Sequence, residues 1–168
     1  MAVVAAVAVP HTIAIIDRPR AHAAARYLAS WMTRARTEAL MRSATVALRF
    51  EQRDSGVYIT EYMDGDRDGV RSRDIADGID RLMQEPVQIS QLFPRVSLAL
   101  SDDVGGSDPV QTGRTTIMSF TPEGTATSGS IYLRGADGSQ FAVRVLGATG
   151  RMRVLRYVPE SRSWVEVM

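Results

Sequence analysis

The strongest constraint on the fold is an apolar start that leads directly into a long helix-forming segment. From residue 1 to residue 16 the only polar side chains are those of His11 and Thr12. Residues 21–43 are rich in Ala, Leu, Met, Arg and Glu, which favour helix. Within them an apolar stripe follows helical spacing, formed by Ala24, Leu28, Trp31, Ala35 and Ala39. The pattern predicts one long helix that packs this stripe against the rest of the chain.

The apolar start is a candidate membrane stem. Its apolar residues include Met1, Val3, Val4, Val7, Val9 and Pro10. A transmembrane helix needs about 20 apolar residues, and Asp17 ends this run earlier. Three interpretations remain open: a buried core helix, the apolar region of a signal peptide, or the distal part of a membrane helix. A proline is compatible with the last, because membrane helices tolerate proline.

After residue 43 the apolar pattern changes from helical spacing to alternation. Residues 44–51 and 56–63 alternate around a polar turn, which predicts a β-hairpin. Turn signals separate further predicted strands at 87–90, 95–100, 115–120, 130–134, 140–146, 151–157 and 164–167. A short helix is expected near Ile79–Met83. We therefore expect an α+β fold, with a helical region (1–43) packed on a β-rich domain (44–168) of one antiparallel sheet or two small sheets.

The composition argues against catalysis. Cysteine is absent, and the only histidines, His11 and His22, lie in the helical region. The β-rich part therefore has no histidine for a Ser-His-Asp site or a His-based zinc site. No glycine-rich phosphate-binding motif follows a predicted strand. We expect a protein that is not an enzyme and that has no resident organic cofactor.

An acidic segment is a candidate Ca²⁺ site. Asp64, Asp66 and Asp68 alternate and are followed by Gly69, as at the start of a calcium loop. The twelfth position holds Ile75, so the bidentate glutamate of an EF-hand is missing, and Asp74 or Asp77 would have to replace it. The alternative is a self-paired loop, in which Arg67, Arg71 and Arg73 neutralise the aspartates.

Arginines near the C-terminus are candidate anion ligands. Residues 111–168 carry seven arginines against four acids, whereas residues 54–110 carry five against twelve. Side chains alternate along a strand, so Arg151 and Arg153 would share one face, with Arg156 nearby in sequence. Two guanidiniums on one face can bind phosphates or carboxylates. The alternative is an edge strand that its charges keep from aggregating.

Taken in order, several segments resemble the GspH/FimT family of minor pilins and type II secretion pseudopilins. They are the stem with its helix, the acidic turn at residues 64–69, Phe120-Thr-Pro-Glu-Gly124 with Gly129–Leu133, and Gly150-Arg-Met-Arg153. The resemblance implies a pilin-like fold and a non-enzymatic subunit of a type II secretion system or a type IV pilus. It also implies a single-pass inner-membrane stem, a periplasmic body, and partner pilin subunits bound through the helix.

Two further expectations follow from this resemblance. Family members begin with a basic leader and a glutamate that serves assembly, and neither is present, so we expect roughly a dozen residues of the mature helix to precede this sequence. In the FimT branch the G-R-x-R arginines bind DNA, which implies a DNA-binding role for Arg151 and Arg153. A secreted calcium-binding β domain is the remaining alternative.

Overall fold

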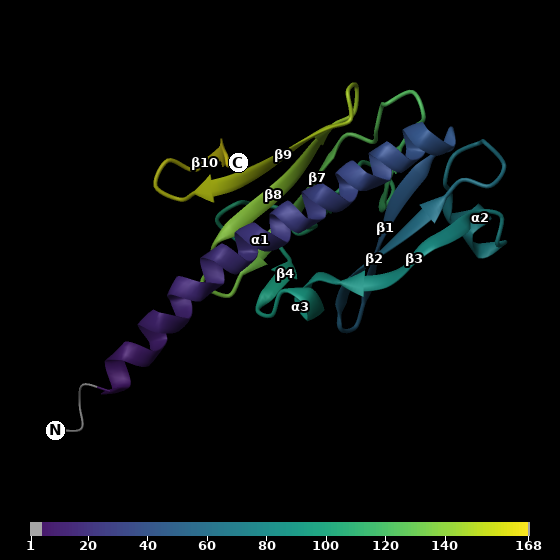
Figure 1. Cartoon of the computed structure of the whole chain (residues 1–168). Coiled ribbons are helices and arrows are strands. Elements are labelled where there is room, and N and C mark those ends of the chain that lie inside the picture. Colours follow the sequence, from purple (N-terminus) through teal and green to yellow (C-terminus); the bar gives the residue numbers. More distant parts are fainter. Residues whose placement is uncertain (1–4, 168) are drawn as a thin grey trace.

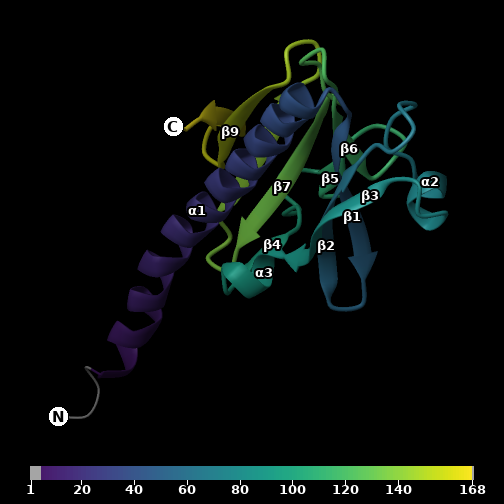
Figure 2. The same cartoon turned by 45° about the vertical axis from the view of Figure 1, so that its right-hand side comes forward.

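The computed structural model describes residues 5–167, with side chains from Asp17 onward. Its dominant element is α1 (Ala5–Arg42), a single helix of 38 residues. At 1.5 Å per residue this helix is about 57 Å long. The later part of α1 crosses the β-sheets, while its first part extends away from them (Figures 1 and 2). Within residues 5–167, no helix is both long and apolar enough to span a membrane.

The β-strands form two antiparallel sheets. The four-stranded sheet has the order β3 (Arg81–Gln88), β2 (Gly56–Met63), β1 (Val46–Arg53), β6 (Ile117–Phe120). The six-stranded sheet has the order β10 (Ser163–Glu166), β9 (Arg151–Val158), β8 (Gln140–Leu146), β7 (Gly129–Gly135), β4 (Val96–Leu98), and the short β5 (Val110–Gln111) also pairs with β7. Two short helices, α2 (Ser72–Ala76) and α3 (Ile89–Leu92), flank β3.

The core lies between α1 and both sheets. Every residue of the predicted stripe is buried, from Ala24 to Ala39. The alanines let the helix approach the sheets closely, and larger side chains fill the remaining space, among them Phe50, Phe120, Phe141, Met118 and Leu133. Burial of this apolar surface is the main force that holds the helix on the sheets. The structure confirms the α+β, pilin-like fold with one long helix on two antiparallel sheets.

Some local predictions are wrong. The predicted hairpin forms as β1 and β2, with Val46 opposite Met63. The helix expected near Ile79–Met83 does not form, because β3 begins at Arg81 and pairs with β2. The short helix lies earlier, at Ser72–Ala76. The strand expected at 87–90 is divided between the end of β3 and α3.

The stem is only partly described. Met1, Val3 and Val4 lie outside the described residues. Val7, Val9 and Pro10 belong to the backbone of α1, which continues as helix through Pro10 and Pro19. Each proline lacks the backbone N–H that would bond to the carbonyl four residues earlier. Each of these two turns of the helix therefore lacks one backbone hydrogen bond.

Candidate functional site

The first candidate site is a groove on the outer face of the six-stranded sheet, the face turned away from α1. Arg151 and Arg153 are exposed on this face of β9, as the alternation predicts. A third arginine, Arg144 of β8, lies directly opposite Arg153. The groove has a volume of about 520 Å³ and is lined by these arginines together with Gln111, Ser128, Gly129, Ser130, Val145 and Leu146.

The arginines of this groove have few partners. The Nε of Arg144 donates a hydrogen bond to the hydroxyl of Ser130, at 3.2 Å. Arg153 forms an ion pair with Glu166, at 3.6 Å, and both side chains are about half exposed. Among the side chains that the structure describes, Arg144 and Arg151 form no ion pair. Like charges directly opposite each other destabilise a sheet, so an anion bound between Arg144 and Arg153 would relieve this repulsion.

Arg156 is not part of this groove. Alternation along β9 places it on the opposite face, toward α1, where its Nε is buried without a hydrogen-bond partner. It lies close to His22, whose ring stacks on Phe141 with centroids 5.4 Å apart. Burial lowers the pKa of His22, and the positive charges of Arg26 and Arg156 lower it further. The structure therefore brings Arg151 and Arg153 together and places Arg156 in the helix–sheet interface.

Sequence reasoning missed Arg144, although a signal was present. The turn at residues 147–150 connects β8 and β9, so a regular hairpin pairs residue 146 with 151 and residue 144 with 153. Extending the pairing outward from that turn would have placed Arg144 beside the G-R-x-R arginines.

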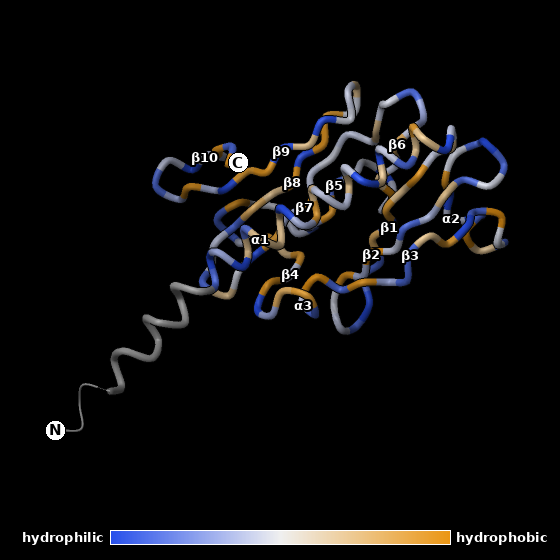
Figure 3. The backbone as a smooth tube through the Cα atoms, viewed as in Figure 1, coloured by the Kyte–Doolittle hydropathy of each residue, from blue (hydrophilic) through white to orange (hydrophobic). Residues whose placement is uncertain are grey.

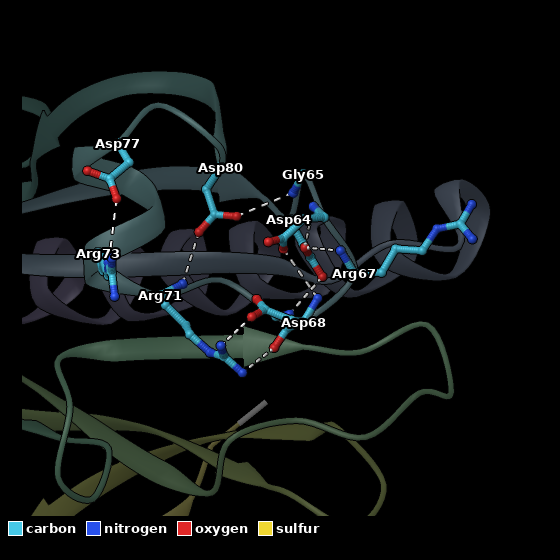
Figure 4. A network of polar contacts seen from close by, with 10 residues as sticks. Asp64, Gly65, Arg67, Asp68, Arg71, Arg73, Asp77 and Asp80 are labelled. Carbon is cyan, nitrogen blue, oxygen red and sulfur yellow. Dashed lines mark hydrogen bonds and ion pairs between the residues drawn. The ribbon is translucent and has the colours of Figure 1, made fainter.

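The second candidate site is the acidic loop after β2, a hydrophilic segment in Figure 3. Carboxylate oxygens of Asp64, Asp66 and Asp68 lie within 4.8 Å of one another. Asp64 is buried and accepts three backbone N–H groups (Figure 4): its Oδ1 from Asp66 at 3.2 Å and Arg67 at 2.8 Å, and its Oδ2 from Gly69 at 2.9 Å. Most of the acceptor capacity of this carboxylate is thus used within the loop.

A second buried carboxylate, that of Asp80, closes the same loop. Its Oδ2 accepts the backbone N–H of Arg71 at 2.9 Å, and its Oδ1 accepts that of Gly65 at 3.3 Å. The side chain of Arg71 forms an ion pair with Asp68. These contacts, drawn in Figure 4, connect the two ends of the loop and pair its most acidic part with arginine.

The charges of the loop affect one carboxyl group. The pKa of Asp68 is raised, first by desolvation and then by the carboxylates of Asp66 and Asp74, against the opposing effect of Arg71. Asp77, the other residue considered as a replacement ligand, instead pairs with Arg73 at 3.6 Å. In the described part of the chain, Asp74 and Asp77 are not members of the carboxylate cluster.

The comparisons with known proteins agree with this architecture. The chain matches the family model described as type II transport protein GspH over residues 24–150. The match runs from the packed part of α1 to the turn before β9, and so ends one residue before Arg151. Neither a curated protein nor a solved structure matches the chain. Because the family model covers well over half of its residues, the chain belongs to the GspH family.

Proposed function

We propose that this chain is a minor pseudopilin, a subunit that helps to build the pseudopilus of a type II secretion system. The GspH family is structural rather than enzymatic, and its members assemble with other pseudopilins. In the proposed arrangement, the stem of α1 is anchored in the bacterial inner membrane and the β-sheet body faces the periplasm. The stem then packs against the stems of neighbouring subunits as the filament grows.

One observation carries this proposal: α1 is much longer than the surface that the sheets cover. Where the structure describes the side chains of α1, from Asp17 onward, the buried residues end at Ala39, and the backbone of the helix begins at Ala5 and extends away from the body (Figure 2). The part of the helix that extends away from the body is rich in Ala and Val, and small apolar residues allow helices to pack closely. A helix with one end held by the body and the other end apolar suits assembly through stems.

Complementation tests this proposal. A host strain that lacks the gene is given the full chain or its Val7→Asp/Val9→Asp variant, and secreted protein is measured in the medium. Two charges in the stem should abolish secretion, because buried stem–stem contacts do not tolerate unpaired carboxylates. The matched control, Leu92→Asp/Val165→Asp, places the same charges at exposed apolar positions of the body. Normal secretion with the stem variant, at equal protein level, would contradict the proposal.

A second candidate function is DNA binding at the outer groove. The observation that favours it is the third arginine, Arg144, beside Arg151 and Arg153. Groove residues in the described part of the chain include no aromatic ring, so stacking on bases is not expected. Contact with phosphates, which is independent of base sequence, is the mode that three guanidiniums support.

A salt series tests this function. Binding of the full chain to duplex DNA is measured at increasing salt, for the wild type, Arg144→Ala, Arg151→Ala/Arg153→Ala and the exposed control Arg162→Ala. The slope of log K against log salt should fall by about 1 for each groove arginine removed. Arg162→Ala should leave the slope unchanged. If the wild type does not bind, or if the groove variants bind like the control, the groove is not a DNA site.

A further inference from the structure

An ion pair between a buried carboxylate, Asp17, and a half-exposed guanidinium, Arg95, lies where α1 joins the body. Asp17 is only 2 % exposed, although its neighbour Arg18 is exposed to solvent. The guanidinium of Arg95 binds the carboxylate of Asp17 in a bidentate manner: Nε lies 3.0 and 3.1 Å from the two oxygens, and Nη2 lies 2.9 Å from Oδ2. Arg20 adds a weaker contact at 3.8 Å. A planar fork of this kind restrains direction as well as distance.

The backbone of Arg95 is held in an unusual conformation. Its φ angle is 69°, in the left-handed region that non-glycine residues rarely adopt. Its carbonyl accepts the backbone N–H of Ala136 at 3.0 Å, and the next residue, Val96, pairs with Gly135 of β7. A costly conformation persists when the surrounding structure enforces it, and such conformations concentrate at functional positions. Backbone pairing therefore positions Arg95 at the edge of the six-stranded sheet, from which its side chain reaches α1.

The same turn of α1 contains a weak point. Pro19 lies two residues after Asp17 and has no N–H to bond to the carbonyl of Ile15. The first buried alanine of the core, Ala21, follows two residues later and packs near Gly135 of the same sheet. The ion pair thus lies within residues 15–19, the turn that lacks one backbone hydrogen bond and bends more easily, just before the packed part of the helix.

We propose that Asp17 and Arg95 form a clamp that holds the turn of α1 around Pro19 on the body and restrains bending of the stem at that turn. Force applied to the stem then reaches the six-stranded sheet through Arg95, instead of peeling α1 away from its first turn onward. The role of this clamp in assembly rests on the proposed pseudopilin function. Its effect on the direction of the stem is a property of the chain alone.

Distance measurements between spin labels test the clamp. The chain has no cysteine, so Thr12→Cys in the stem and Gln91→Cys on the exposed surface of α3 introduce two unique label sites. The labelled full chain is studied in detergent micelles as the parent protein and as Arg95→Met, Asp17→Arg/Arg95→Asp and Arg162→Met. Arg162 is the matched control, because it is an arginine with a positive φ of 46° in an exposed turn.

The parent protein and the Arg162→Met control should give the same narrow distance distribution. Arg95→Met should broaden it and should speed amide hydrogen exchange at residues 21–28 by about threefold or more, because the buried carboxylate of Asp17 loses its half-exposed partner and keeps only the weaker contact with Arg20. The exchanged pair, Asp17→Arg/Arg95→Asp, should restore both readouts in part, since the ion pair is rebuilt with opposite polarity and aspartate tolerates a positive φ.

Three results would overturn the clamp. The first is an unchanged distance distribution in Arg95→Met. The second is a rise in amide exchange throughout β7 and β8, which would show that Arg95 supports the whole body and not the helix turn. The third is an exchanged pair as broad as Arg95→Met. Secretion measured with the stem variant Val7→Asp/Val9→Asp separates the two proposals. If that variant leaves secretion normal while the label distances of the clamp variants behave as expected, the pseudopilin function fails and the clamp stands.

Discussion

The carboxylate of Glu61 connects α1 to the four-stranded sheet, and its replacement is the most informative test of the packing. Glu61 is 2 % exposed and accepts a hydrogen bond from the indole N–H of Trp31. Its second partner is Arg34, whose Nη2 lies 3.0 Å from the same oxygen and 2.8 Å from Gln84. The Glu61→Leu variant fills this place with an apolar side chain of similar size but leaves the indole N–H buried without an acceptor.

The expected cost follows from that orphaned donor. An unsatisfied buried donor costs about 1–3 kcal/mol. The loss of Arg34 as a partner adds little, because its side chain is 52 % exposed and water replaces the contact. For a domain of this size, about 2 kcal/mol corresponds to a fall in melting temperature of about 4–8 °C. Thermal and urea denaturation of the full chain would measure the change.

A double-mutant cycle isolates the indole contribution. In a Trp31→Phe background no N–H remains to be orphaned, so Glu61→Leu should cost less there than in the wild type, by about 1 kcal/mol or more. Arg34→Met is the comparison variant, and it should cost about 1 kcal/mol or less because Arg34 lies at the edge of the core. An equal cost of Glu61→Leu in both backgrounds would refute the hydrogen-bond reasoning and would point to packing alone.

Three further outcomes are expected from the acidic loop and from His22. Asp80→Asn should lower the free energy of unfolding by about 1–2 kcal/mol, whereas Asp77→Asn, which loses only an exposed ion pair, should change it by less than about 0.5 kcal/mol; equal effects in urea denaturation would contradict this. Excess Ca²⁺ should leave the melting temperature unchanged, because Asp64 already binds backbone N–H groups; occupation at 100 times the dissociation constant would instead add about 2.7 kcal/mol. The pKa of His22 is lowered in the folded chain, so on acidification the unfolded chain binds the proton first and the free energy of unfolding should fall as the pH drops below about 6.5. If a His22→Gln variant loses the same free energy of unfolding between pH 7 and pH 5, another group is responsible.

The parts of the fold that were predictable rest on local periodicity. The stripe from Ala24 to Ala39 and the hairpin of β1 and β2 are both present, because each pattern spans enough residues to define a buried face. The failure at Ile79–Met83 has the opposite cause. That segment is short, and its own composition does not specify a strand. It forms one because Leu82 pairs with Tyr62 on β2.

The candidate sites divide in the same way. The acidic loop is contiguous, so Asp64, Asp66 and Asp68 were identified as a group from sequence, yet the buried role of Asp80 was not. Asp64 lies 16 positions from Asp80, and only the return of the chain through α2 brings them to one loop. For the arginine groove, strand alternation placed Arg151 and Arg153 on one face, while Arg144 required the pairing of β8 with β9.

The amino-acid sequence by itself determined that a long helix precedes a β-rich body, and which face of that helix is buried, because helix and strand periods are written in neighbouring residues. Only the tertiary structure decided which polar groups meet. Asp17 and Arg95 are 78 positions apart in the sequence, and no local pattern of residues indicates that they are paired. Their contact exists because α1 packs across the six-stranded sheet and because Arg95 adopts a left-handed backbone at the sheet's edge. Long-range contacts of this kind depend on topology, which no local pattern encodes.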